Sequence, residues 1–203
     1  MIRSLEPLEL QAITRPRGSG PEPGWSILVG SFLKVALPIT VVAYGIAAWI
    51  AWKYPYGHSH CCIQFMRHAL EMYAMKHGRF PSGEATPEAS LSLLYHDDNE
   101  CGAGVLRGKT VPLAVVERIL NEGGLLGPDT CGWHYVEGLS PQDDRRFAIL
   151  WDKVGLGHNG QRLSPPGREV LFVGGEVRII RQADWPTFLA EQERLHAERR
   201  KQP

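Results

Sequence analysis

Histidine and cysteine side chains gather in one short stretch that directly follows the longest apolar segment of the chain. The stretch contains His58, His60, Cys61 and Cys62, and His68 comes shortly after it. Imidazole and thiolate are the usual protein ligands of zinc and copper, so the stretch is a candidate metal or redox site. Successive residues of a helix point in different directions, which makes it hard for Cys61 and Cys62 to share one tetrahedral site with both histidines. Two alternatives stay open: Cys62 packs in the apolar stripe of the following helix while the histidines lie at a membrane surface, or the cysteines form a disulfide.

Two further cysteines, Cys101 and Cys131, flank a predicted helix at residues 110–121. In an oxidising compartment they are candidates for a disulfide that closes a loop of about 30 residues, worth roughly 3–4 kcal/mol in the chain-entropy model. The competing interpretation is two free, buried thiols.

Other classes of function find little support in the residues. The 22 lysines and arginines equal the 22 aspartates and glutamates, so no overall field would attract nucleic acid. No phosphate-binding loop and no Gly-x-Ser-x-Gly nucleophile motif occurs. We therefore expect no catalytic residues, no cofactor and no nucleic-acid partner.

The segment from Trp25 to Trp52 carries a single charge, Lys34. At about 1.5 Å per residue, a helix of this length crosses the roughly 30 Å core of a bilayer. Tryptophan and tyrosine cluster at its C-terminal end, where amphipathic rings favour the interface with water. The sequence thus predicts one transmembrane helix over residues 25–53, with the lipid bilayer as its partner.

Basic residues on the N-terminal side, Arg15 and Arg17 before the helix and Lys34 in its first half, outnumber those just after it. Because cytoplasmic flanks are rich in lysine and arginine, this favours an N-terminus inside and an extracytoplasmic body. Residues 1–24 lack apolar periodicity and are interpreted as a flexible tail. We expect a body over residues 54–193 and a charged tail over 194–203.

Within the body, patterns of helical period come first and patterns of strand period follow. Helices are predicted at residues 58–77, after the Thr86-Pro87 capping signal, and at 110–121. Strands are predicted at 133–137, 147–151, 169–173 and 176–181, and a last helix is capped by Asp184. Gly174-Gly175 predicts a two-residue hairpin turn, since primed turns need positive φ. This order indicates an α+β fold with an amphipathic helix packed on a small antiparallel sheet of about four strands.

Two runs of residues resemble known sequences. Residues 62–81 contain Tyr73-Ala74, His77-Gly78 and Phe80-Pro81, which is similar to the L-x-M-Y-A-x-x-H-G-x-F-P stretch after the membrane helix of bacterial pilin-like proteins. Further on, the chain resembles the D-K, H-G-G and V-L-F-x-D-G-x-V ending of the same family. The positions concerned in this second run are Asp152, His158, Gly160, Phe172, Gly174 and Gly175.

The family is that of the type II secretion pseudopilins and their prepilin-type relatives. The resemblance implies a non-catalytic, pilin-like domain exported across the bacterial inner (cytoplasmic) membrane. Envelope or secretion-system proteins are the partners it implies. The segment Gly24-Trp25-Ser26-Ile27-Leu28-Val29 lacks the glutamate that pilin precursors use in assembly. We therefore expect the helix to stay as an anchor.

Overall fold

The computed structural model describes the backbone of residues 23–58, 61–97 and 101–201, and the side chains from residue 32 onward within these ranges. The predicted tail at 1–24 therefore lies almost wholly outside the described residues. The chain divides into two units, with the boundary after Ala48.

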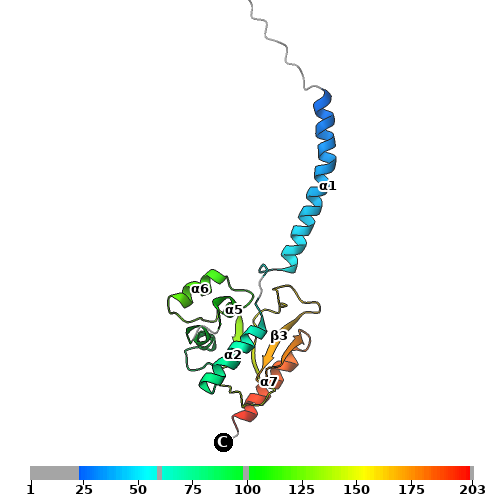
Figure 1. Cartoon of the computed structure of the whole chain (residues 1–203). Helices are drawn as coiled ribbons and strands as arrows, with labels where there is room; N and C mark the ends of the chain where they lie inside the picture. Colours follow the sequence, from blue (N-terminus) through cyan, green and yellow to red (C-terminus); the bar gives the residue numbers. More distant parts are fainter. Residues whose placement is uncertain (1–22, 59–60, 98–100, 202–203) are drawn as a thin grey trace, which may run out of the picture. The chain divides into compact units, whose positions relative to one another are not determined.

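The first element, α1, is a helix of 31 residues from Pro23 to Lys53 (Figure 1). It confirms the apolar helix predicted from Trp25. Pro38 lies inside it and lacks the N–H that would continue the helical ladder. Nearby, the Thr40 hydroxyl donates a hydrogen bond of 2.9 Å to the Ala36 carbonyl. Between Phe32 and Lys53 the helix is long and apolar enough to span a membrane, by length and composition.

The second unit is built on a four-stranded antiparallel sheet whose strands follow one another in chain order. All four predicted strands are confirmed: β1 (Trp133–Tyr135), β2 (Ala148–Asp152), β3 (Gly167–Phe172) and β4 (Val177–Arg181). Side chains alternate between the two faces of a strand, but a register shift between Ala148 and Leu150 changes the alternation in β2. Both faces of the sheet are covered by packed side chains, so all five residues of β2 are buried.

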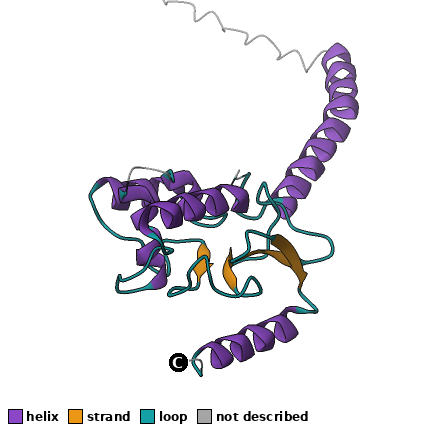
Figure 2. Cartoon of the chain, turned by 60° about the horizontal axis from the view of Figure 1, so that its bottom comes forward, coloured by secondary structure: helices purple, strands orange, loops and turns teal. Residues whose placement is uncertain are grey.

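One face of the sheet is covered by the helices that precede it in the chain (Figure 2). These are α2 (Ile63–His77), α3 (Pro87–Leu91), α4 (Leu93–His96), α5 (Ala103–Leu106) and α6 (Leu113–Asn121). The predicted helix at 58–77 begins only at Ile63, because Cys62 is extended, with φ −101° and ψ 122°. Thr86 caps α3 as expected, its hydroxyl oxygen accepting a hydrogen bond from the Ala89 N–H. The short α5 has no side-chain cap and was not predicted. We call this side of the sheet the α2 face.

The opposite face carries a single helix, α7 (Trp185–Arg199) (Figure 2). Six buried side chains pack between it and the sheet, and we call them the α7 cluster: Ala148, Trp151, Val170, Phe172, Trp185 and Phe188. Asp184 precedes α7 as predicted, but its side chain makes no capping bond and accepts one from Arg181 Nε at 2.7 Å instead. The helix continues to Arg199, so residues 194–199 extend it rather than form a tail.

The turn between β3 and β4 differs from the predicted one. Phe172 N–H donates to the Glu176 carbonyl at 2.9 Å, which leaves a three-residue loop, Val173 to Gly175. Of the two glycines in this loop, Gly175 has a positive φ, 78°, and Gly174 does not. A primed two-residue turn would need a positive φ at Gly174 as well. A turn of ordinary hand followed by one left-handed glycine therefore closes this hairpin.

Candidate functional site

Three charged side chains meet inside the second unit, and we call them the ion cluster: Lys109, Asp152 and Glu169. Lys109 Nζ donates to Asp152 Oδ2 at 2.5 Å and to Glu169 Oε2 at 2.7 Å. It also donates to the Leu156 carbonyl at 3.1 Å, so all three ammonium protons have acceptors. The side chains of Lys109 and Asp152 are only 1% and 2% exposed, and that of Glu169 is 15% exposed.

The two carboxylates are brought together by strand pairing. Trp151 of β2 pairs with Val170 of β3, so the next position along places Asp152 opposite Glu169 on the α2 face. Two like charges directly opposite one another destabilise a sheet. The Lys109 ammonium, which is paired with both carboxyl groups, offsets the repulsion between them.

Lys109 reaches this place because two backbone segments cross very closely. Gly108 has φ 63°, and a Cβ added there would lie 2.6 Å from Gly132 Cα. A Cβ added to Gly132 would lie 2.5 Å from the Arg107 carbonyl oxygen. Only glycine fits both positions, and the crossing fixes the turn after α5 against the start of β1.

The electrostatics of the cluster favour one extra proton on Asp152. Burial raises the pKa of Asp152 to about 7, and Glu169 adds to the effect while Lys109 opposes it. Burial lowers the pKa of Lys109, but the two carboxylates more than offset this and leave it above its ordinary value. Asp152 Oδ1 is buried and has no hydrogen-bond partner among the described residues. These shifts favour the neutral acid form of Asp152 and the ammonium form of Lys109.

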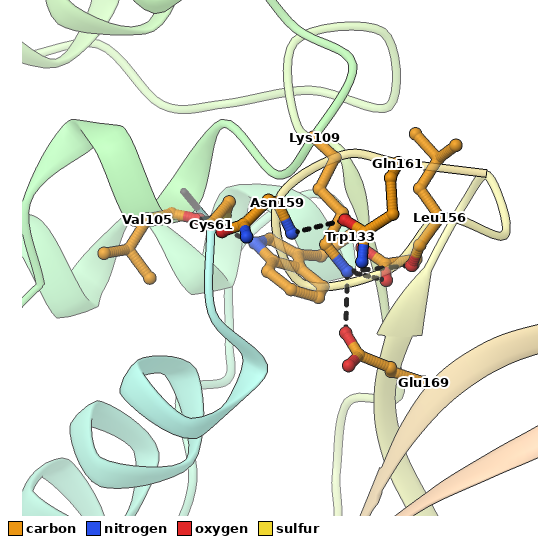
Figure 3. A network of polar contacts seen from close by, with 9 residues as sticks. Cys61, Val105, Lys109, Trp133, Leu156, Asn159, Gln161 and Glu169 are labelled. Carbon is orange, nitrogen blue, oxygen red and sulfur yellow. Dashed lines mark hydrogen bonds and ion pairs between the residues drawn. The ribbon is translucent and has the colours of Figure 1, made fainter. Parts of the chain in front are cut away.

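An indole ring and a thiol border the ion cluster (Figure 3). The Trp133 ring centroid lies 5.9 Å from Lys109 Nζ. Trp133 Nε1 donates to the Val105 carbonyl at 2.7 Å, and Cys61 Sγ donates to the same oxygen at 3.1 Å. Burial first, and then the charge of Asp152, raises the pKa of the Cys61 thiol to about 12. Cys61 is therefore a neutral, buried thiol and not an activated nucleophile.

Burial limits what this arrangement can do chemically. A substrate that diffuses in solution cannot reach Lys109 or Asp152, because both side chains are almost fully covered. The cluster can stabilise the fold, or it can react internally, among its own members.

The predicted metal ligands are only partly within the described residues. His58 is exposed and Cys61 and Cys62 are buried, whereas His60 lies outside the described residues. His68 is exposed on α2. No group of three or more metal-ligating side chains gathers in the described part of the chain. A metal site at this stretch stays a prediction.

Cys101 and Cys131 are both buried free thiols in this structure. Cys101 Sγ lies 3.9 Å from Met66 Sδ, and Cys131 Sγ donates to the Leu106 carbonyl at 3.5 Å. Burial raises the pKa of Cys101 to about 12, and the neighbouring Cys131 thiol contributes to that shift. Their pairing also stays a prediction.

The residues of the first family-like run shape the end of α2. The rings of Tyr73 and His77 stack with centroids 4.2 Å apart, and Gly78 ends the helix with φ 72°. Phe80 is buried, and the Pro81 carbonyl accepts a hydrogen bond of 2.8 Å from a tyrosine hydroxyl of β1. These positions thus have structural roles.

The second run contributes to several places. Asp152 belongs to the ion cluster, and His158 and Gly160 lie in the loop after β2. Phe172 belongs to the α7 cluster, and Gly174 and Gly175 form the hairpin turn. The two runs meet where Arg67 Nη1 of α2 donates to the Gly175 carbonyl at 3.3 Å.

Sequence reasoning singled out Asp152 but missed Lys109 and Glu169. A carboxylate directly after the apolar run Phe147–Trp151 was a usable signal, since such a residue is buried unless the strand ends early. A buried carboxylate needs a cation, but the sequence does not say which of the 22 lysines and arginines supplies it.

Comparison of the chain with models of known protein families, with curated proteins and with solved structures finds no match.

Proposed function

We propose that this chain is a non-catalytic, membrane-anchored, pilin-like envelope protein. In this proposal α1 stays in the bacterial inner membrane, and the body lies on the extracytoplasmic side as an accessory part of a secretion or pilus-like assembly. The observation that carries the proposal is the surface of α1. Its large apolar side chains are exposed, for example Phe32 at 72%, Val42 at 60% and Trp49 at 54%.

An apolar surface of this kind is costly in water, and soluble proteins rarely leave such a large patch uncovered. The side chains between Phe32 and Lys53 are not buried by the rest of the described chain. A bilayer would cover all of them at once. Lys53 lies with its ammonium 4.7 Å from the Trp49 ring centroid, an arrangement suited to a membrane interface.

The body supports the pilin-like part of the proposal through its layout. The helix α2, separate from the apolar segment and following it in the chain, packs on an antiparallel four-stranded sheet, and this α+β layout supports the proposal. Lys109 and Asp152 are almost fully buried, so the ion cluster does not offer an open active site to a diffusing substrate.

Membrane anchoring is tested by placing a charge in the middle of α1. Ile46→Arg with Val42→Arg should move the full-length protein from the carbonate-resistant membrane fraction to the soluble or degraded fraction, since an arginine at the bilayer centre is costly. Leu189→Arg, on α7, is the matched control and should leave the protein in the membrane. Anchoring would be excluded if the double variant fractionated like the parent.

The side of the membrane and the partner are tested in intact cells. Protease added outside spheroplasts should digest the body, and a photo-crosslinking side chain at Met75, which is 74% exposed on α2, should capture an envelope protein. A body protected from protease in spheroplasts would refute the topology. Failure to capture any envelope protein from Met75 or from the exposed Phe65 would refute the adaptor role.

A further inference from the structure

The ion cluster holds an amine and a carboxyl group in a position to react with each other. We propose that Lys109 and Asp152 condense to an intramolecular isopeptide bond, with Glu169 as the group that carries the protons. The proposal goes beyond the proposed function and does not depend on it.

The first support is proximity. Lys109 Nζ lies 2.5 Å from Asp152 Oδ2, so the amine nitrogen is next to the carboxyl carbon it would attack. Both side chains are almost fully buried and fixed, by the glycine crossing on one side and by strand pairing on the other. Holding two reactants in this way is equivalent to an effective concentration on the order of 10⁵ M or more.

The second support is the protonation state of the carboxyl group, while the ammonium of Lys109 must give up a proton to Glu169 before it can react. An amine attacks a carboxylic acid far more readily than a carboxylate, and the raised pKa of Asp152 favours the acid. Asp152 Oδ1 has no hydrogen-bond partner in the described part of the chain, which further disfavours a full negative charge on this carboxyl. Water is excluded, and this favours condensation over hydrolysis.

The third support is a base at the right place. Glu169 Oε2 lies 2.7 Å from Lys109 Nζ, within reach of the proton that the ammonium must lose. Moving that proton to Glu169 turns an ion pair into two neutral groups, so the net charge of the buried cluster does not change. Glu169 is also its most exposed member.

The reaction balances without any further reagent. Glu169 takes a proton from the Lys109 ammonium, and the neutral amine attacks Asp152 Cγ, forming the C–N bond as the carbonyl electron pair moves to oxygen. Glu169 then gives this proton to the hydroxyl oxygen, whose bond to Cγ breaks as water leaves and the carbonyl re-forms. Finally, Glu169 accepts the second proton from the nitrogen. One ammonium, one carboxylic acid and one carboxylate become one amide, one water and one carboxylic acid.

The experiment is the intact mass of the full-length protein after its thiols have been reduced and alkylated. We expect the mass to be lower than that of the sequence by one water. Trypsin should then release a branched peptide in which residues 108–118 are joined to residues 147–153, because an amidated Lys109 is not cleaved. A protein with the full mass of the sequence would overturn the proposal.

Loss of water within residues 147–153 alone would also overturn it, since a cyclic imide at Asp152 gives the same mass without a crosslink. Two variants complete the test. Lys109→Arg keeps the positive charge, lacks the amine and should have its full mass. Glu169→Gln keeps the shape and should show the bond strongly reduced or absent. Unchanged crosslinking in Glu169→Gln would refute the role given to Glu169, and the near-ultraviolet circular dichroism of each variant establishes that it is folded.

Discussion

The two faces of the sheet are held in different ways. On the α2 face, a large apolar core surrounds a charged group, the ion cluster, whose members come from three distant segments. On the opposite face, α7 is held by a smaller cluster that is rich in aromatic rings, with Trp185 and Phe188 packed at 5.0 Å. Arginines flank it by stacking on rings, as Arg178 does on Phe172 at 3.8 Å.

The comparison shows how strongly each kind of contact restricts which residues can be substituted. A buried charge tolerates only one partner arrangement, because removing one member leaves the others uncompensated. Aromatic packing tolerates several arrangements of similar energy and is lost gradually. The α2 face should therefore be sensitive to single changes in the ion cluster, and the α7 face should respond locally.

The largest effect is expected for Lys109→Met. Two buried carboxyl groups lose their common partner, and the proposed amide cannot form, so the free energy of unfolding should fall by at least about 3–5 kcal/mol in denaturant titrations of the full-length protein in detergent. Arg194→Met removes an exposed pair with Glu198 and is the control, with an expected loss of about 0–1 kcal/mol. Equal losses in both variants would erase the contrast between buried and surface charge.

Phe188→Ala comes next and probes the other face. Removing this ring from the α7 cluster should cost about 3 kcal/mol, because the helix loses its ring contacts with Trp151 of β2 and Phe172 of β3. Hydrogen exchange should speed up in α7 while α2 stays protected. Leu189→Ala, at a position that is 37% exposed, should change little. If exchange rose equally in α2 and α7, the two faces would form one cooperative unit and the comparison would fail.

A smaller effect is expected at the hairpin that both faces share. Gly175→Ala forces a side chain into the left-handed region and toward Glu71, at about 1–2 kcal/mol in thermal unfolding. Gly174 does not have a positive φ, so Gly174→Ala should cost less, although its added Cβ would lie 3.0 Å from Arg145 Cβ. Equal losses of stability in the two variants would support the two-residue turn predicted from the sequence and contradict the three-residue loop.

The smallest effect concerns pH and two histidines, one on β1 and one on α7. Burial lowers the pKa of His134, which stacks on Trp151, and of His196, which packs on Phe147, below the ordinary value of 6.5. The unfolded chain therefore takes up protons first as the pH falls. The stability these rings contribute is fully present above pH 6.5 and decreases as the pH drops toward the depressed values.

The free energy of unfolding should be lower at about pH 5.5 than at about pH 7.5. In a variant with His134→Gln and His196→Gln, the difference between the two pH values should be smaller. Other titrating groups are common to both proteins, so the difference between them isolates the two histidines. The same pH dependence in both proteins would assign it elsewhere.

Much of the fold was predictable because local patterns and tertiary structure agree. The apolar run of α1, the Thr86 cap and the four strand patterns each carry their own signal. The start of α2 and the turn at Gly175 were less predictable, because they depend on packing against other segments. Gly175 lies under Glu71 and Arg67 of α2, a contact between residues more than one hundred positions apart.

Of the three members of the ion cluster, only Asp152 could be predicted from the sequence, for a similar reason. Asp152 stands out after an apolar strand, but the sequence around Lys109 resembles any exposed turn. That lysine is buried because the backbone crosses at Gly108 and Gly132. A close approach of two backbone segments produces no periodic pattern in the sequence.

The sequence spacing within the ion cluster also sets an order of events during synthesis. Lys109 is separated from Asp152 by 43 positions and from Glu169 by 60, and such long-range contacts form late and slowly. A chain made from its N-terminus completes α1 well before Glu169 exists, so the ion cluster cannot form until most of the body has been made. Under the proposed membrane topology, the body would still be unfinished when the apolar helix becomes available for insertion, and an export machinery would receive an unfolded chain.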